Sequence, residues 1–271
     1  MKQAIAISGL WKSYGEHAVL KGLDLCIAAG ECFALLGVNG AGKTTALECM
    51  EGLRKYDKGR IEVSGKLGIQ LQAASLPACI RPMEAVRLFA KWNGAPLDNA
   101  MLQRLGIREM GKKQYAQLST GQKRRLHLAL ALIPSPDIVF LDEPTAGLDV
   151  EGRRLLHEQI RMLKSQGRTI VLASHDMAEV EALCDRIAIL NEGKIAFCGT
   201  SAALSQRLGK KYLIHIRTNR ESRTLQAERI GEALLALLEA QREQGEELLD
   251  IRIDRGTLEQ HFLEIAGRTK K

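Results

Sequence analysis

Residues 37–44 of the chain read Gly37-Val38-Asn39-Gly40-Ala41-Gly42-Lys43-Thr44, and Thr45 follows directly. This is the spacing of a phosphate-binding loop, in which a glycine and four further residues precede Gly-Lys-Thr. The apolar residues 32–36 before the loop predict a buried strand, and residues 44–50 behind it predict the first turns of a helix. Because strand, loop and helix form the context that such a loop requires, the stretch predicts an α/β fold that binds a nucleotide.

The residue types of this loop suit polyphosphate chemistry. Glycines let several backbone N–H groups approach the phosphates closely, and the helix N-terminus adds unpaired donors and a partial positive charge. We expect Lys43 to reach the β- and γ-phosphates and the Thr44 hydroxyl to bind Mg²⁺. The alternative, an ordinary glycine-rich turn, is disfavoured because the flanking strand and helix are both present.

Composition narrows the class of protein. The chain has 271 residues, of which 45% are hydrophobic and 26% charged, so it is long and apolar enough for one large or two unequal domains. The aromatic content of 4% disfavours a stacking surface for single-stranded nucleic acid. The net charge of +7 fits a protein beside a membrane, a nucleic-acid binder, or neither. Apolar runs are too short for a signal peptide or a membrane span, so we expect any membrane role to require a partner.

The six cysteines include no Cys-x-x-Cys pair and mostly lie in apolar segments. We expect them to be reduced core residues of a cytoplasmic protein and not a metal or disulfide framework.

Apolar residues alternate with other residues over positions 4–30, with glycines between the runs. This pattern predicts a small antiparallel sheet at the edge of the nucleotide domain. Tyr14 lies in this region and could stack on a base, but spacing alone favours a tyrosine at a strand end with its ring half buried. Residues 60–72 predict two short strands, and residues 82–106 predict a helix that Asn-Gly-Ala-Pro breaks at positions 93–96.

Polar residues follow two further predicted strands. Residues 138–143 form an apolar strand that ends in Asp142 and Glu143, where a phosphate-loop fold carries the aspartate that directs Mg²⁺. Two adjacent acids at the end of a buried strand are hard to explain by solvation alone. Residues 168–173 form another strand, which ends at Ser174-His175-Asp176. Together with the strand before the loop, these strands predict a mostly parallel sheet with its ligand at the carboxyl ends.

Residues 118–122 read Leu-Ser-Thr-Gly-Gln and precede a basic and then apolar run. Ser119 and Gln122 have the spacing of a helix capping box. The stretch is either only a cap, or a helix N-terminus that meets an anion, with Gly121 giving close access. Beyond residue 199 the pattern changes to a small α+β appendage. It has predicted strands at 212–217 and 248–253, predicted helices at 225–242 and 258–265, and a joint at 209–211.

Taken in order, five stretches resemble the nucleotide-binding subunit of ATP-binding cassette (ABC) transporters: residues 37–45, Gln72, residues 118–122, residues 138–143 and His175. The resemblance covers about residues 3–200. It implies that Tyr14 stacks on adenine, which reverses the preference drawn from spacing. The ATP-binding residues that it implies are Tyr14, Gly37, Val38, Asn39, Gly40, Ala41, Gly42, Lys43, Thr44, Thr45, Ser119, Gly121, Gln122 and Asp149.

The resemblance also implies catalytic roles. Glu143 looks like the base that polarises water, and His175 looks like the switch histidine on the γ-phosphate, with Lys43 on the same phosphates. Gln72 looks like the glutamine that touches Mg²⁺ or the attacking water and faces the membrane subunit. The implied Mg²⁺ ligands are Thr44, Gln72 and Asp142. The five other histidines match no motif, and we interpret them as surface or core residues: His17, His127, His157, His215 and His261.

In the family, Ser119 and Gly121 would contact the ATP of the other subunit, so the resemblance implies an active site that is complete only in a head-to-tail dimer. The family signature usually reads Leu-Ser-Gly-Gly-Gln, and Thr120 stands here in place of its first glycine. A side chain at this position could weaken closure of the dimer.

The expected organisation follows from this resemblance. Residues 1–205 would form the ATP-binding domain, with a helical signature subdomain at about 73–135, and residues 206–271 would form a small α+β domain. The tail at 257–268 resembles that of drug-resistance export cassettes. We therefore expect an ATP hydrolase, with ATP and Mg²⁺, that powers a separately encoded membrane permease, favouring an exporter. It would pair as a homodimer or with a second cassette, lie at the inner face of the cell membrane, and bind no nucleic acid.

The sequence disfavours three other functions. A soluble cassette ATPase that acts on nucleic acid or the ribosome typically has two cassettes in one chain or a long coiled-coil insertion, and this chain has neither. A nucleotide-gated regulator without turnover is disfavoured by Glu143. A GTPase is disfavoured because the chain has no Asn-Lys-x-Asp for reading guanine.

Overall fold

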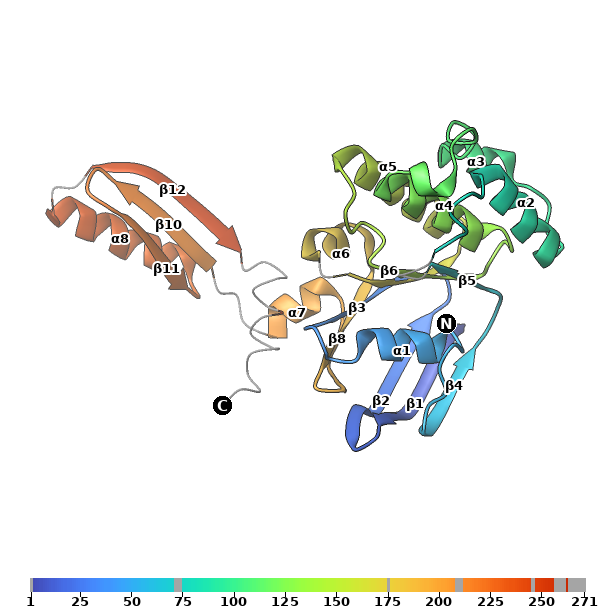
Figure 1. The fold of residues 1–271 in the computed structure, drawn as a ribbon. Helices are drawn as coiled ribbons and strands as arrows, with labels where there is room; N and C mark the ends of the chain where they lie inside the picture. The colour runs from blue at the N-terminus through green and yellow to red at the C-terminus, as the bar shows by residue number, and fades with distance from the viewer. Residues whose placement is uncertain are drawn as a thin grey trace. The chain divides into compact units, whose positions relative to one another are not determined.

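The computed structural model describes residues 2–70, 75–174, 176–207, 212–244, 247–255 and 262 (Figure 1). The chain forms two compact units, Met1–Cys198 and Gly199–Lys271. The division comes before the boundary expected between residues 205 and 206, and the predicted joint at 209–211 lies outside the described residues.

A six-stranded sheet is the centre of the first unit, and its strand order is β5-β6-β7-β3-β8-β9. The four pairings among its first five strands are parallel, which confirms the predicted mostly parallel sheet. The strands β3 and β7 are apolar and buried along their length, as expected where helices or a second sheet cover both faces. The bounds are β3 Cys32–Gly37, β5 Leu67–Gln70, β6 Ile138–Asp142, β7 Thr169–Ala173, β8 Arg186–Asn191 and β9 Lys194–Gly199.

The strands β8 and β9 were not predicted. They are joined by Glu192 and Gly193, whose φ angles are 48° and 82°. Two consecutive residues with positive φ form the tight turn that suits a β-hairpin. The strand β9 therefore turns back beside β8 and ends the sheet as an antiparallel edge.

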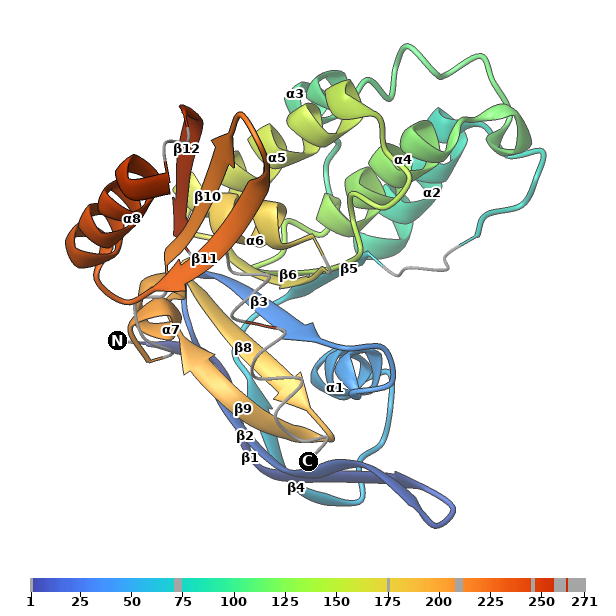
Figure 2. The same cartoon turned by 90° about the vertical axis from the view of Figure 1, so that its left-hand side faces the viewer.

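A second sheet with the order β2-β1-β4 confirms the predicted antiparallel edge sheet. Its strands are β1 Gln3–Tyr14, β2 His17–Ala28 and β4 Lys58–Val63. Figure 1 and Figure 2 both show this sheet and α1 (Lys43–Met50) on one side of the central sheet, with α4, α5 and α6 on the other. The main core lies between the two sheets and α1, where Ile5, Leu20, Leu47, Phe33 and Phe140 are buried together.

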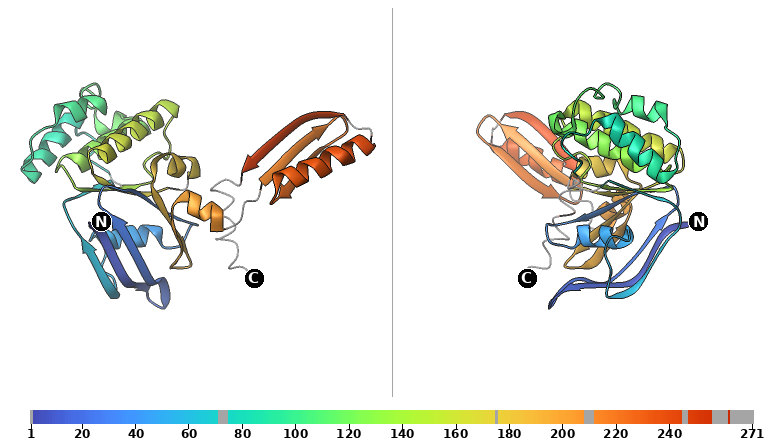
Figure 3. Two further views of the ribbon diagram at one scale, coloured as in Figure 1. Left: turned by 180° about the vertical axis from the view of Figure 1, so that it is seen from behind. Right: turned by 45° about the vertical axis from the view of Figure 1, so that its right-hand side comes forward.

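A group of helices forms one end of the first unit and appears together in both views of Figure 3. The predicted helix over 82–106 is broken as expected, because Gly94 ends α2 at a φ of 58° and the Asp98 carboxylate caps α3 by accepting from the Met101 N–H. No helix in the part of the chain that the structure describes is long and apolar enough to cross a membrane. The helices of the first unit besides α1 are α2 Pro82–Asn93, α3 Asn99–Arg104, the 3-10 turn Tyr115–Gln117, α4 Thr120–Leu132, α5 Val150–Ser165 and α6 Met177–Leu183.

The second unit has an antiparallel sheet with the order β11-β10-β12 and the helix α8 along one face of it (Figure 1). The helix predicted from residue 225 is wrong at its start, because Leu225 lies in β11 opposite Ile214 of β10. The Thr218 hydroxyl accepts from the N–H groups of Arg220 and Glu221 and so closes a turn that returns the chain as a strand. Apart from Phe262, the helix predicted over 258–265 lies outside the described residues. The elements are α7 Ser201–Arg207, β10 Tyr212–Thr218, β11 Ser222–Ala227, α8 Ile230–Gln244 and β12 Leu248–Arg255.

All six cysteines are free thiols. Cys32 and Cys49 are buried, but Cys26, Cys79 and Cys198 are exposed, so the expectation of core cysteines is wrong for these three. Cys26 shows the reason, because strand alternation turns it outward between the buried Leu25 and Ile27.

Candidate functional site

The phosphate-binding loop joins β3 to α1, and its residues Val38, Asn39 and Gly40 are exposed. A Cβ atom at Gly37 would lie 2.6 Å from the Leu190 carbonyl oxygen, so a side chain there would force β8 away. Gly42 has a φ of 104°, and a Cβ there would also lie 3.0 Å from Leu20 of β2. The loop therefore needs glycine at both ends for its conformation and its packing.

Lys43 begins α1 and lies back along the loop. Its ammonium group donates to the carbonyl oxygens of Gly37, at 2.6 Å, and Val38, at 3.3 Å. Burial lowers the pKa of Lys43 from its ordinary value, while the charges of Glu143 and Asp142 raise it. The ammonium group thus contacts the loop and lies within electrostatic reach of the two predicted acids. Thr44 is exposed and Thr45 is half-buried behind it.

Asp142 is the last residue of β6, and β7 separates that strand from β3. Two strand spacings leave about 10 Å between the strand that ends in the loop and the strand that ends in the acids. Burial, and then the charge of Glu143, raise the pKa of Asp142, while Lys43 and Arg124 lower it. A hard cation beside Asp142 would stabilise its charged form, and carboxylate oxygens are ligands that such cations prefer.

Glu143 has a φ of 48°, in the left-handed region that side chains seldom adopt. Its N–H donates to the Ala173 carbonyl of β7 at 2.9 Å, and its own carbonyl accepts from the Ala146 N–H at 3.2 Å. These two bonds hold the chain reversal at the carboxyl end of the sheet. Glu143 is therefore fixed in a strained conformation next to Asp142.

The predicted capping box at the start of α4 is confirmed. The Ser119 hydroxyl accepts from the Gln122 N–H at 3.2 Å, and the Gln122 side chain accepts from the Ser119 N–H at 3.1 Å. Ser119, Gly121 and Gln122 line one surface pocket together with Asp149. Asp149 caps α5 by accepting from the Gly152 N–H at 2.7 Å. The structure thus brings together four of the predicted ATP-binding residues, from two segments that the sequence separates.

Thr120 lies at the same pocket and packs against the loop that leads to Asp149. Its Cγ2 atom would be 3.3 Å from a Cβ placed on Gly147, whose φ is 73°. The extra side chain in the signature is therefore accommodated by a glycine in the facing loop.

Tyr14 ends β1 with 43% of its surface exposed. The Lys12 ammonium lies 5.5 Å from the centre of the ring, and the Arg54 guanidinium lies 5.3 Å from it. The ring is thus accessible and has two cations beside it. Two predicted site residues, Gln72 and His175, lie outside the described residues.

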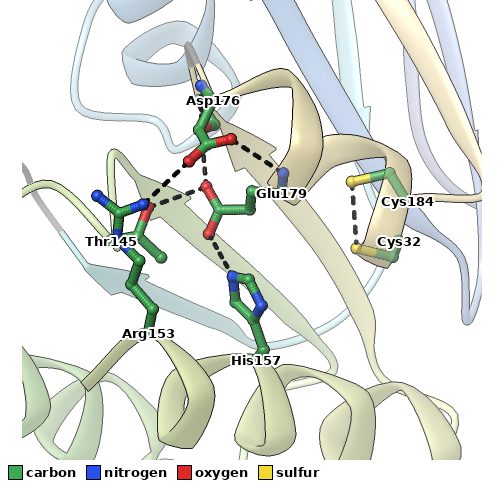
Figure 4. A network of polar contacts seen from close by, with 8 residues as sticks. Cys32, Thr145, Arg153, His157, Asp176, Glu179 and Cys184 are labelled. Atoms are coloured by element: carbon green, nitrogen blue, oxygen red, sulfur yellow. Dashed lines mark hydrogen bonds and ion pairs between the residues drawn. The ribbon is translucent and has the colours of Figure 1, made fainter. Parts of the chain in front are cut away.

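A buried network, which the sequence analysis missed, surrounds Glu179 of α6 (Figure 4). Its carboxylate accepts from the hydroxyls of Ser174, at 2.7 Å, and Thr145, at 3.0 Å, and lies 3.3 Å from Nε2 of His157. Thr145 follows Glu143 by two residues, and Ser174 directly precedes His175. The network therefore ties together the loops that follow β6 and β7. Its one signal in the sequence is the three-residue spacing from Asp176 to Glu179, which is typical of a helix cap. The structure contains this cap, in which the Asp176 carboxylate accepts from the Glu179 N–H at 3.1 Å.

Glu51, at the end of α1, carries a second perturbed carboxyl group. Only 8% of the residue is exposed, and burial, with the charges of Asp142 and Glu48, raises its pKa to about 7. Because the folded-state pKa lies above the unfolded value, this group contributes stability that is present below about pH 4.5 and is lost as the pH rises through about 7.

We therefore expect Glu51→Gln to raise the thermal midpoint at alkaline pH and to change it little at acidic pH. The check is the thermal unfolding midpoint of both proteins as a function of pH. The two curves should separate progressively between about pH 4.5 and 7. Parallel curves across this window would show that Glu51 ionises normally in the folded protein.

With this geometry in place, comparison with known proteins identifies the family. The model of the ABC transporter family matches residues 20–146. The daunorubicin resistance ATP-binding protein DrrA3 of Streptomyces coeruleorubidus is 32% identical over 307 aligned positions, which cover 99% of this chain and 97% of that protein. This chain belongs to the ATP-binding subunits of ABC transporters.

Further members of the family agree. The linearmycin resistance ATP-binding protein LnrL of Bacillus subtilis is 34% identical and covers 76% of this chain and 72% of that protein. A dimeric structure of a bacterial ABC transporter cassette is 25% identical, with a TM-score of 0.66, and covers 72% of this chain and 98% of that one. The predicted fold class and the resistance and export type are confirmed, and nothing supports the nucleic-acid alternative. ATP binding, and ATP hydrolysis coupled to transport, are the activities of this ABC subunit.

Proposed function

We propose that this chain drives an exporter, as one of two cassettes arranged head to tail beneath a separately encoded membrane permease. The observation that carries the proposal is the separation of two half-sites. The pocket of Ser119, Gly121, Gln122 and Asp149 contains none of the loop residues 37–45. Residues that would act on one γ-phosphate thus line different parts of the same subunit, and a second cassette would complete each site.

Within one half-site, the phosphate loop and Lys43 would hold the β- and γ-phosphates while Tyr14 stacks on the adenine. Thr44 and Asp142, together with Gln72, would hold Mg²⁺. The raised pKa of Asp142, caused by burial and then by the charge of Glu143, fits that role, since a cation next to this carboxylate would stabilise its charged form. The bound ion would neutralise charge on the phosphate oxygens.

Glu143 would polarise the attacking water, and His175 would contact the γ-phosphate. The left-handed conformation of Glu143 fixes the position of its backbone before ATP binds, so little reorganisation would be needed at the reaction step. The partner's copy of the Ser119 pocket would close over the γ-phosphate, and hydrolysis would release the pair. This cycle would move the permease at the inner face of the membrane.

Export follows from the relatives, which are named for resistance to daunorubicin and linearmycin and for export of Nod factor. The cargo would contact the permease and not the cassette, so this chain supplies only the energy. No nucleic-acid partner is proposed.

The arrangement can be tested by mixing two inactive variants. Lys43→Ala damages the phosphate loop, and Ser119→Arg blocks the other half-site. In a mixed pair, one composite site carries both lesions and the other carries neither. We expect the mixture to recover part of the wild-type ATPase activity after subunit exchange, measured as phosphate release in the presence of the permease or at high protein concentration.

Each variant incubated alone through the same exchange procedure is the control. Crosslinking should establish that mixed pairs have formed. If such pairs remain as inactive as either parent, the shared two-site arrangement is wrong for this chain.

A further inference from the structure

The positive charge of the chain is concentrated in its helical part. Residues 81–135 contain ten Lys and Arg residues against three Asp and Glu residues, a net charge of +7. The formal net charge of the whole chain is also +7, so the remaining residues balance to zero. Opposite charge on a partner would therefore be attracted mainly to this part of the first unit.

The outward face of α2 combines these charges with large apolar side chains. Arg87 and Lys91 are four residues apart and exposed, and they form one row along the helix. Leu88 and Trp92 form the adjacent row, with 55% and 78% of their surfaces exposed. The opposite face of α2, which includes Val86, is buried. A basic row and an apolar row thus lie side by side on solvent-facing helix surface.

The surroundings of these rows do not neutralise them. Within the described residues, neither Arg87 nor Lys91 forms an ion pair with an acidic side chain. Glu84, the acidic residue on the same face, accepts from the Arg81 N–H at 2.9 Å at the start of the helix. The Trp92 ring makes an edge contact with Phe89 at 6.2 Å between ring centres, which steadies an otherwise exposed indole.

We propose that this face of α2 binds the anionic phospholipid surface of the membrane. The surface is the outside of one helix and is convex, so it fits a planar headgroup layer better than a peptide that needs a groove. Helices that lie at a membrane surface combine basic side chains with Trp and Leu. The basic groups contact the lipid phosphates, and the apolar groups enter the boundary between headgroups and acyl chains. The proposal rests on the proposed function, because a cassette beneath a permease lies next to lipid. It adds a direct lipid contact for the cassette itself.

Trp92 supplies its own probe, since the chain has two tryptophans and Trp11→Phe leaves Trp92 as the single one. The full chain with this change would be mixed with vesicles of phosphatidylcholine, with or without phosphatidylglycerol. We expect a blue shift of the Trp92 emission and co-sedimentation only with phosphatidylglycerol, both weakened by salt. Each basic residue near an anionic surface contributes about fivefold, so Arg87→Glu with Lys91→Glu should lower partitioning at least about 25-fold.

The matched control reverses two exposed charges on strands, Lys58→Glu with Lys194→Glu, and changes the net charge equally. An equal loss in the control would overturn the proposal, since binding would then follow net charge alone. The chain could instead bind neutral vesicles only when they contain the permease, in a way that requires Arg87 and Lys91. That result would also overturn the proposal, in favour of a protein partner. Equal partitioning to vesicles with and without phosphatidylglycerol, or no binding to either, would also overturn the proposal. The α2 variants should keep their ATPase activity in solution, so failure of lipid binding is distinct from failure of the mixing experiment.

Discussion

Glu143→Gln should lower ATP hydrolysis by about 10²-fold or more and leave ATP binding intact. Glutamine keeps the shape of the side chain but cannot accept a proton or polarise water as well. Because the backbone bonds of Glu143 to Ala173 and Ala146 do not involve the side chain, the fold around it should persist. Phosphate release and a nucleotide titration measure the two effects, and the variant should accumulate as an ATP-bound dimer on size exclusion.

Glu192 is a matched control within the same chain. It has the same φ of 48°, but it lies in the hairpin turn between β8 and β9. Glu192→Gln should hydrolyse ATP at the wild-type rate. If Glu143→Gln hydrolyses ATP at the wild-type rate, Glu143 is not the base.

Glu179→Ala should destabilise the first unit by about 3 kcal/mol or more, because three side-chain partners lose a buried carboxylate. At 2–4 °C per kcal/mol this corresponds to a fall of roughly 6–12 °C in the thermal midpoint. The measurement is the thermal unfolding of the full chain followed by circular dichroism. Activity should fall as well, since the loops after β6 and β7 lose their common anchor.

An exposed glutamate gives the comparison. Glu158→Ala removes only an ion pair with Arg154 on the surface of α5, and should cost about 0.3–0.5 kcal/mol. Glu179→Gln retains a carbonyl acceptor, so its loss of stability should lie between those of Glu179→Ala and Glu158→Ala. If Glu179→Ala and Glu158→Ala are equally mild, the buried network does not stabilise the protein.

The sequence allowed the central architecture to be predicted because its signals are local. The phosphate loop has a fixed spacing, and β3, β6 and β7 are uninterrupted apolar runs with polar residues at their ends. The strands β8 and β9 were missed because Arg186 and Lys194 begin them and no motif follows. The strand β11 was absorbed into the helix after it, since Leu225 and Ala227 also suit a helical pattern. Hydrogen bonds to the Thr218 side chain close the turn that leads into β11, and they are visible only in three dimensions.

Part of the candidate site could likewise be predicted from local signals, and part could not. Lys43 and Asp142 could be placed from motif and strand order, and each affects the pKa of the other. The proximity of Asp149 to Ser119 depends on where the fold places the starts of α4 and α5, which spacing does not determine. Glu179 lay beyond prediction because its partners come from three separate segments. A buried acid of this kind is recognised by what surrounds it and not by its neighbours in sequence.

The left-handed backbone of Glu143 sets stability against activity at one position. A residue with a side chain loses about 1 kcal/mol in that conformation, whereas glycine adopts it freely and asparagine adopts it with less strain. Replacement by either would remove strain and the proposed base together. Selection for thermostability alone would therefore drift toward inactive proteins at this position, and only continued demand for transport would keep a glutamate there.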